Sequence, residues 1–163
     1  MFKATGTVQP AIGIPFERGG ELLVDTFEQR VRDSFQRQAF MTTLGAEIAT
    51  GKKGEVEIRF PFRPSLTQQN GFVHAGAITS VLDSACGYAA LSVAPPDHDV
   101  LSIEFKVNFL SPAVGEEFCA RSHLKGAGKN LIVCAADAFA LKNGQEKLVA
   151  TMLATIMAVK HIA

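Results

Sequence analysis

Residues 74–93 read HAGAITSVLDSACGYAALSV, a run without proline that is rich in alanine and in apolar side chains. It is long enough for about five turns of helix, and its composition favours that structure. Apolar residues occur on nearly every side of the predicted helix, so we expect it to be buried. Asp83 lies near its middle, where a carboxylate must either be paired or have its ionisation perturbed by burial. Asp83 is therefore either a structural hydrogen-bonding residue or a general base or nucleophile.

The chain before this run predicts a leader and one further helix. Residues 1–20 are dense in glycine and proline, so we expect an irregular leader without a core of its own. Residues 25–41 are predicted to form an amphipathic helix, because apolar residues recur there close to helical spacing with charges between them. These apolar residues are Phe27, Val31, Phe35 and Phe40. We expect residues 21–163 to form a single domain, because a chain of 163 residues supplies one hydrophobic core.

Six further stretches are predicted to be strands. They are LGAEIAT at 44–50, EVEIRFPF at 55–62, VLSIEFKVNFL at 100–110, EFCARSHLKG at 117–126, NLIVCAADAFAL at 130–141 and KLVATMLATIMAV at 147–159. Glycine-containing turns at 51–54, 126–129 and 143–144 predict hairpins between neighbouring strands. The order of helix, two strands, long helix and four strands predicts an α+β fold, in which one mainly antiparallel sheet curls around the long helix.

The composition argues against several classes of protein. Sixteen basic and sixteen acidic residues cancel, so the chain lacks the strong positive field of a nucleic-acid-binding protein. The sequence shows neither a secretory signal nor a stretch of about 18 apolar residues that would predict a membrane span. Cys86, Cys119 and Cys134 have no CxxC spacing and lie among apolar residues, as thiols in a reducing compartment do. We therefore expect a cytoplasmic protein that binds neither nucleic acid nor membrane.

The start of the long helix is a second candidate for function. His74, Ala75 and Gly76 lie where a helix exposes backbone N–H groups and partial positive charge, which suits an oxyanion hole. A histidine at this position is also a common cap or packing residue. The separation of His74 from Asp83 is 83 − 74 = 9 residues, about 13 Å along the axis and half a turn out of phase. If both groups serve one substrate, they must come from two subunits, so the spacing predicts an obligate homo-oligomer with two-fold symmetry.

The segment QQNGFVHAGAITSVLDSACGYAA at 68–90 resembles the signature of PaaI-like hot-dog thioesterases, the phenylacetyl-CoA type. IEFKVNFLSPA at 103–113 resembles the strand ending in a proline turn that the same family has, and the likeness extends over about residues 40–160. The resemblance implies a hot-dog fold, hydrolysis of acyl-CoA thioesters, no cofactor, and a homodimer or homotetramer. It also suggests an aromatic or medium-chain acyl group and a place in phenylacetic acid degradation.

The resemblance also implies roles for particular residues. Asp83 matches the family's base or nucleophile, and Ser102 matches a hydroxyl that assists it from the next strand. Gln68 matches an amide that positions the water or the thioester, and His74 matches the histidine of the family's HGG motif. Ala75 stands where the family has a glycine whose backbone N–H polarises the thioester carbonyl. The N–H survives this change because it belongs to the backbone, but a methyl group now approaches the substrate.

Further substrate contacts are expected around this motif. Asn70, Gly71 and Gly76 flank the catalytic positions, and Lys125 and Lys129 beside a glycine-rich turn are expected to meet the phosphates of CoA. No metal site is expected, because the sequence shows no ligand spacing among the remaining histidines. These are His98, His123 and His161.

Two other functions remain open from the sequence. A hydratase or dehydratase of the same fold would use a paired Asp and His on one segment, and the opposite directions of His74 and Asp83 disfavour it. A non-catalytic acyl-CoA binding module would use Asp83 only structurally.

Overall fold

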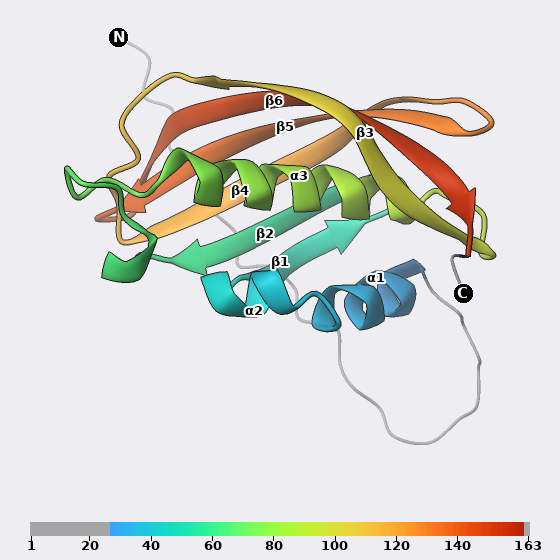
Figure 1. Ribbon diagram of the computed structural model, residues 1–163, viewed down its shortest axis with the longest axis horizontal. Coiled ribbons are helices and arrows are strands. Elements are labelled where there is room, and N and C mark those ends of the chain that lie inside the picture. Colours follow the sequence, from blue (N-terminus) through green and yellow to red (C-terminus); the bar gives the residue numbers. More distant parts are fainter. Residues whose placement is uncertain (1–26, 162–163) are drawn as a thin grey trace, which may run out of the picture.

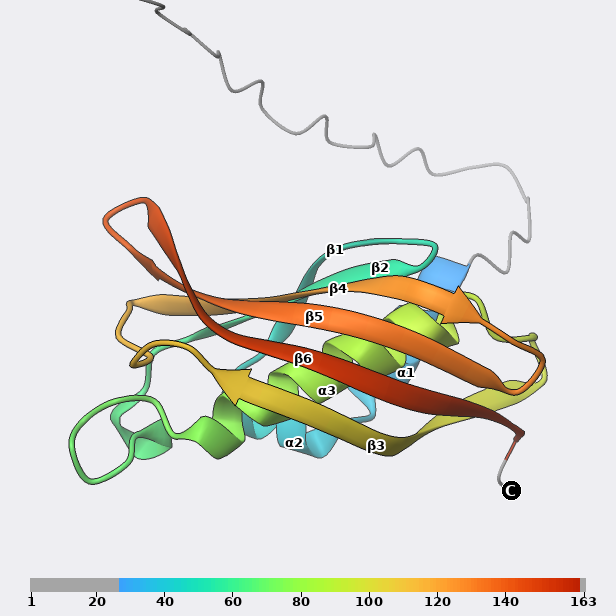
Figure 2. The same cartoon turned by 90° about the horizontal axis from the view of Figure 1, so that it is seen from above.

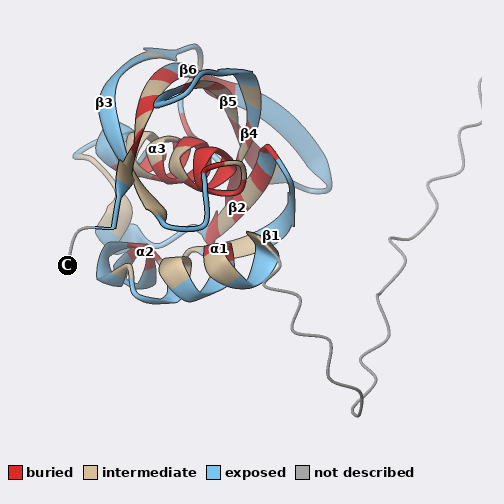
Figure 3. Cartoon of the chain, turned by 90° about the vertical axis from the view of Figure 1, so that its right-hand side faces the viewer, coloured by how far each residue is buried: buried red, intermediate tan, exposed pale blue. Residues whose placement is uncertain are grey.

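The computed structural model describes residues 27–161, so the predicted leader at residues 1–20 lies outside the described part of the chain. A six-stranded antiparallel sheet curls around helix α3, Ala75–Leu91 (Figures 1 and 2). The shorter helices α1, Phe27–Gln36, and α2, Ala39–Leu44, lie across the open side of this curl, as the end view shows (Figure 3). The predicted α+β arrangement of one antiparallel sheet around one long helix is confirmed.

The sheet has the strand order β1-β2-β4-β5-β6-β3, and every neighbouring pair is antiparallel. The strands are β1 Glu47–Lys52, β2 Glu55–Pro61, β3 His98–Phe109, β4 Glu117–Ala127, β5 Leu131–Lys142 and β6 Gln145–Lys160, with a short 3-10 helix, η1, at Pro64–Leu66. Alternate residues of the central strands are buried against α3, as period-two side-chain alternation requires. All six predicted strands are therefore present, and β1 and β3 form the two edges of the sheet.

Two of the three predicted hairpin turns contain residues with positive φ. Asn143 and Gly144 have φ values of 51° and 73°, the combination that a two-residue turn between twisted strands requires. Gly54 has φ 81° in the turn between β1 and β2. The first predicted strand is shorter than expected, because Leu44 ends α2 and β1 begins only at Glu47.

Helix α3 packs most of its surface against the sheet but leaves one stripe uncovered. Ala85, Cys86 and Ala89 are fully buried, and their small side chains let the strands approach the helix closely. A second set of helix residues is only half-buried or exposed, so the prediction that the helix is buried on nearly every side is wrong for this stripe. The stripe comprises Gly76, Thr79, Ser80, Asp83 and Gly87.

The predicted helix over 25–41 is wrong in its extent. The described residues instead form α1, Phe27–Gln36, and α2, Ala39–Leu44, separated by a break at which Gln38 has φ −84° and ψ 89°. Neither glycine nor proline causes this break. The side chain of Gln38 contacts α3, so a tertiary interaction accompanies the change of direction. Phe40, which was expected on the packed face, is 52% exposed.

Arg30 on α1 ties the first helix to the end of α3. Its guanidinium donates hydrogen bonds to the carbonyl oxygens of Leu91, Ala94 and Pro95. A helix leaves its last carbonyl groups unpaired and carries partial negative charge there, so a cation that also donates hydrogen bonds suits this position. This contact fixes α1, and with it the α1–α2 junction, over the C-terminal half of α3.

The three cysteines are free and buried, as predicted for thiols of the interior. Burial raises the pKa of the Cys86 thiol, so it stays protonated at neutral pH, in keeping with the expectation that Cys86 is a core residue. None of the helices in the described residues is long and apolar enough to cross a membrane.

Candidate active site

Asp83 and Ser102 meet where α3 faces the edge strand β3. Oγ of Ser102 donates a hydrogen bond of 2.6 Å to Oδ1 of Asp83. Ser102 is paired with the fully buried Ile156, so its side chain lies on the face of the sheet toward the helix. The register of β3 shifts between Ser102 and Glu104, and such a bulge re-aims neighbouring side chains. This contact is compatible with the predicted assistance of Asp83 by Ser102, and the catalytic roles of both residues stay predictions.

A cavity of about 340 Å³ opens beside this pair, and we call it the Asp83 cavity. It is formed by α3 from Asp83 to Leu91, the first half of β3 and the junction between α1 and α2. Its walls carry several hydroxyl, amide and carboxylate groups besides Asp83 and Ser102. These belong to Ser34, Gln38, Ser84, Tyr88 and Asp99.

His74 caps the N-terminus of α3. Its Nδ1 accepts a hydrogen bond of 2.8 Å from the N–H of Gly76, so the neutral ring carries its proton on Nε2. A Cβ on Gly76 would lie 3.0 Å from Nδ1, which is tighter than most contacts of real side chains. Glycine at this position therefore permits the ring to approach the helix. The capping role of His74 is observed, while its predicted catalytic role and the substrate contact of Gly76 stay predictions.

The N–H of Ala75 is the donor left available at the start of α3. The N–H groups of Ala77 and Ile78 both bond to the carbonyl of His74, and that of Gly76 bonds to the His74 ring. Within residues 27–161, the N–H of Ala75 has no acceptor. An unpaired N–H at a helix N-terminus can stabilise a negatively charged oxygen. The geometry is compatible with the oxyanion role predicted for Ala75.

Residues 68–72 form a tight loop that leads into α3. The N–H of Gln68 bonds to the carbonyl of Phe72 at 2.8 Å, and the N–H of Gly71, which has φ 82°, bonds back to the carbonyl of Gln68 at 2.9 Å. Oε1 of Gln68 accepts a hydrogen bond from the N–H of Asn70. The NH₂ end of the same amide is therefore the end left to meet a ligand. Asn70 and Gly71 shape the loop that holds Gln68, and their predicted substrate contacts stay predictions.

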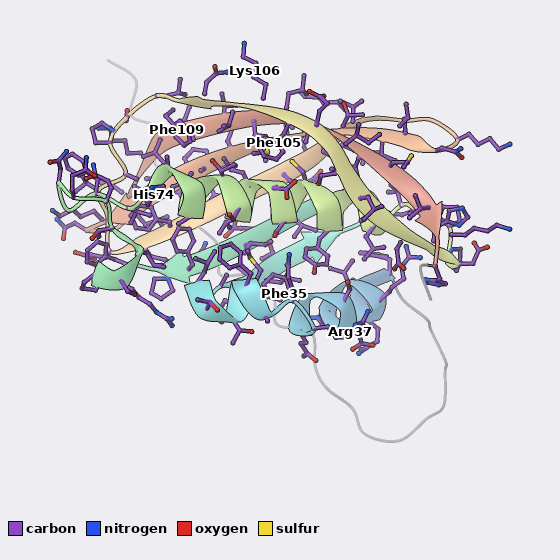
Figure 4. The ribbon with its side chains drawn as sticks, in the orientation of Figure 1. Phe35, Arg37, His74, Phe105, Lys106 and Phe109 are labelled. Carbon is purple, nitrogen blue, oxygen red and sulfur yellow. The ribbon has the colours of Figure 1, made fainter. Side chains whose placement is uncertain are left out.

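A second cavity, of about 400 Å³, contains both Gln68 and Ala75, and we call it the Ala75 cavity. Most of its walls are apolar. They include Phe72, Val73, Ile78, Phe109, Leu110 and Val149. Figure 4 shows His74 and Phe109 at the same end of the molecule, the N-terminal end of α3, with Phe105 farther along β3.

One chain does not bring the predicted catalytic groups together. Gln68 and Ala75 line the Ala75 cavity, whereas Asp83 and Ser102 line the Asp83 cavity. Ala75 and Asp83 are eight positions apart on α3, about 12 Å along its axis. Within the described residues, the predicted catalytic groups therefore line two separate cavities of one chain.

The predicted phosphate-binding lysines lie elsewhere. Lys125 is at a bulge near the end of β4 and Lys129 is in the turn that follows, and neither lines the Ala75 cavity or the Asp83 cavity. Both side chains are exposed, and their predicted contact with CoA stays a prediction. In the described part of the chain, no group of three or more His, Cys, Asp or Glu side chains is placed to hold a metal ion.

Sequence reasoning missed the polar residues of the Asp83 cavity. Gln38 lies within the last turn of a stretch that reads as continuous helix, and Tyr88 and Ser84 read as core positions of α3. Burial raises the pKa of the Tyr88 phenol, while a hydrogen bond with Ser34 and the charge of Arg37 oppose that shift. The hydroxyl stays protonated at neutral pH. The one signal in the sequence was that Tyr88 is the only tyrosine among an apolar run.

Comparison with known proteins identifies the family. The crystal structure of a thioesterase family protein from Silicibacter pomeroyi is 51% identical to this chain, covers 83% of it and 99% of that protein, and superimposes with a TM-score of 0.82. The chain belongs to the thioesterase superfamily. The sequence profile of this superfamily matches residues 70–147, which include α3 and β3.

One further solved structure is similar in fold, and one further protein is similar in sequence. The Escherichia coli PaaI protein from the phenylacetic acid degradation operon shares 18% identity over 85% of this chain and 96% of that one, with a TM-score of 0.74. At that identity the likeness establishes the hot-dog fold alone. The medium/long-chain acyl-CoA thioesterase YigI of E. coli K12 is 27% identical over 133 residues, which cover 72% of this chain and 84% of that protein.

Proposed function

We propose that this thioesterase hydrolyses acyl-CoA thioesters at a site shared by two copies of the chain. Asp83 and Ser102 of one copy would face Ala75 and Gln68 of the other. The observation that carries the proposal is the division of these groups between two cavities, with Ala75 and Asp83 about 12 Å apart along the axis of α3. The similarity to an acyl-CoA thioesterase supports the choice of substrate.

The edge strand β3 supports pairing of two copies. Its outer edge has no strand beside it within the described residues, and it exposes large apolar side chains that water disfavours. These include Leu101, Ile103, Phe105 and Phe109. Antiparallel pairing of β3 with a second β3 about a two-fold axis at Phe105 would place Glu104 opposite the second copy's Lys106, which is a favourable pair.

This pairing would also assemble the site. Because β3 runs antiparallel to α3, the pairing brings the N-terminal end of one α3 toward the C-terminal half of the other. The Ala75 cavity of one copy would then adjoin the Asp83 cavity of its neighbour. The second copy would also cover Ser102, which is exposed in a single chain, and would strengthen the interactions of Asp83 by excluding water. A dimer is thus the smallest active unit, and a homotetramer would contain two such dimers.

The proposed chemistry needs only water as a second reactant, and so no cofactor. Asp83 accepts a proton from water while the water oxygen forms a bond to the thioester carbon. The carbonyl electron pair moves onto oxygen, where the N–H of Ala75 and the NH₂ of Gln68 stabilise the charge. The carbon–sulfur bond then breaks, and the CoA sulfur takes the proton from Asp83. Direct attack by Asp83, followed by hydrolysis of the anhydride, gives the same products.

The first test removes the carboxylate. Asp83→Asn should lower kcat by about a hundredfold or more in an assay of free thiol released from acyl-CoAs of differing acyl group, as expected for loss of a general base or nucleophile. Asp99→Asn is the matched control, because Asp99 lines the same cavity but bonds to His161. If the unaltered protein binds acyl-CoA but hydrolyses none of the panel, the enzyme proposal falls and a binding module replaces it.

A complementation test addresses the shared site. Ala75→Pro removes the N–H at the first position of α3, where proline is tolerated, and His74 already has backbone angles suited to a following proline. Both Ala75→Pro and Asp83→Asn should be inactive alone. Co-expression should restore about a quarter of the normal activity, because half of randomly formed dimers then hold one intact site. A mixture that stays inactive while mixed dimers form would place the whole site within one chain.

A further inference from the structure

The first half of β3 breaks the alternation that its own sequence predicts. From residue 101 to residue 109, apolar and polar side chains alternate without interruption, as in a regular strand with one face toward a core. The apolar residues are Leu101, Ile103, Phe105, Val107 and Phe109, and the polar residues between them are Ser102, Glu104, Lys106 and Asn108. This pattern predicts that Ser102 points away from α3, on the same face as Lys106.

Beyond the bulge the structure follows this pattern. Phe105 pairs with Ala154, which is fully buried in the core, so Phe105 lies on the face of the sheet toward α3. Lys106, the next residue, lies on the other face, as Figure 4 shows. Val107 and Phe109 also pair with buried residues of β6. The second half of β3 is therefore a regular strand with its apolar side chains on the face toward the helix.

Before the bulge the two faces are exchanged. Ser102 pairs with the buried Ile156 and so faces the helix. Leu101 lies on the outer face opposite Met157 and is 45% exposed. Ile103 has no partner on β6, so it is the extra residue that exchanges the faces. One inserted residue thus turns a polar side chain toward the helix and an apolar side chain away from it.

A regular register of the same residues is the alternative to the bulge. Continuing the pairing of the second half of β3 back through the bulge would set Ile103 opposite Ile156, a core residue. It would set Leu101 opposite Ala158, which is also buried. Ser102 would then lie on the outer face, because a shift of one residue moves every side chain to the other face. Within the described residues β3 has β6 as its one neighbouring strand, so the shift changes a single ladder of the chain.

The contact with Asp83 favours the bulged register. The regular register would turn Leu101 and Ile103 toward the core in exchange for Val100, which is partly buried there now. Against this stands the hydrogen bond of 2.6 Å from Ser102 to Asp83, which the bulged register alone allows. Burial of one large apolar side chain and a hydrogen bond to a carboxylate contribute free energies of similar size. The two registers are therefore close in free energy, and the local pattern is broken at the residue that contacts the candidate base.

We infer that Ile103 is a positioning residue whose place in the chain turns Ser102 toward Asp83, and that β3 has a second, regular register in which Asp83 loses this partner. The inference rests on the proposed function, in which Ser102 assists Asp83. The bulged register is the active one. The hydrogen bond between Ser102 and Asp83 both assists catalysis and holds the first half of β3 in that register, while the chain at residues 92–97 takes up the one-residue difference.

Engineered disulfides between β3 and β6 report the register. Leu101→Cys with Met157→Cys sets two thiols opposite each other on the outer face in the bulged register, within reach of a disulfide. Leu101→Cys with Ala158→Cys sets them on opposite faces in that register, so this second pair closes only in the regular register. Each pair is oxidised with diamide, and the crosslink is measured by mass spectrometry of the digested protein.

Both pairs should close, the second more slowly than the first. Adding Ser102→Ala should speed closure of the second pair by about tenfold or more, because the hydrogen bond that holds the bulged register is gone. Adding Thr155→Val should leave closure unchanged, since Thr155 faces Glu104 in both registers. A second pair that stays open while the first closes would overturn the inference. This result is independent of hydrolysis, so it decides the register even if no thioester is cleaved and the proposed function falls.

The activity of the crosslinked forms tests the positioning role. Thioester cleavage is followed by loss of the thioester absorbance, and each oxidised variant is compared with its own reduced form. The pair at 101 and 157 should keep kcat/KM within about threefold, because it fixes the active register. The pair at 101 and 158 should lose about tenfold or more and recover on reduction with dithiothreitol. Equal activity in the two crosslinked forms, in a protein that does hydrolyse thioesters, would refute the positioning role alone.

Moving the hydroxyl by one residue gives the closing test. In the regular register residue 103 lies opposite Ile156, the place that Ser102 has in the bulged register. The double variant Ser102→Ile with Ile103→Ser therefore returns a hydroxyl to Asp83 only if β3 adopts the regular register. Its kcat/KM should exceed that of Ser102→Ile alone by about tenfold or more. Equal values in the two variants would show that the register is fixed and would overturn the inference.

Discussion

Removal of the Ser102 hydroxyl should slow thioester hydrolysis without unfolding the protein. Ser102 donates a bond of 2.6 Å to Asp83, and a hydrogen bond to a charged group contributes about 1.5–3 kcal/mol. If the bond orients Asp83 in the transition state, its full loss corresponds to a factor of about 10 to 160 in kcat/KM, since each 1.36 kcal/mol is tenfold. Ser102→Ala should therefore lie in this range, and Ser102→Thr, which keeps a hydroxyl, should retain more activity.

Thr155 provides a matched control on the neighbouring strand. Its Oγ1 donates a bond of 2.7 Å to Glu104, also between β6 and β3, but on the opposite face of the sheet from Ser102. Thr155→Val removes a hydroxyl–carboxylate bond of nearly the same length and should leave kcat/KM within about twofold, a small effect in free energy. The assay is thiol release from an acyl-CoA, with urea unfolding to confirm equal folding. Equal losses in Ser102→Ala and Thr155→Val would show that the effect is structural and refute the reasoning.

Three other predictions concern stability and reactivity. Arg30→Met should lower the free energy of unfolding in urea by about 2 kcal/mol, because the carbonyl oxygens at the end of α3 lose a charged donor. The control Arg32→Met, at an exposed position, should change that free energy by less than about 0.5 kcal/mol. Equal changes in the two variants would contradict the capping role of Arg30. The hydrogen bond from Arg121 holds the pKa of Glu146 below its ordinary value, so this pair stabilises the fold above the ordinary glutamate pKa and less as pH falls through the lowered value. The urea midpoint should thus decline less on acidification in Glu146→Gln, and an unchanged decline would refute the assignment. Cys86 is fully buried and its burial raises the pKa of the thiol, so a thiol-specific reagent should label it at pH 8 only as fast as the protein unfolds. Mass spectrometry of the digested protein measures this labelling. Rapid labelling of the folded protein would contradict the place of Cys86 in the core.

Much of the fold could be predicted because local patterns carried it. Strands β2 and β5 alternate regularly between buried and less buried residues, and the hairpin turn at Asn143 and Gly144 needs residues that tolerate positive φ. The prediction of one continuous helix over 25–41 failed because nothing local interrupts it. The break at Gln38 coincides with hydrogen bonds to Ser84 and Tyr88, which lie 46 and 50 positions away in the chain. Helical spacing cannot report such a contact.

The candidate site likewise combines features that the sequence sets with features that tertiary packing sets. The sequence by itself determined that Asp83 stands on a mostly apolar helix and that His74 opens that helix out of phase with it, because helix periodicity follows from residue spacing alone. Only the tertiary structure decided that Ser102 donates a hydrogen bond to Asp83 and that the Gln38 side chain lines the Asp83 cavity. It also decided that the N–H of Gly76 bonds to the ring of His74, which leaves the N–H of Ala75 as the unpaired donor. These outcomes depend on how strands and helices pack across large distances in the chain, and such packing is set by the whole core rather than by any single segment.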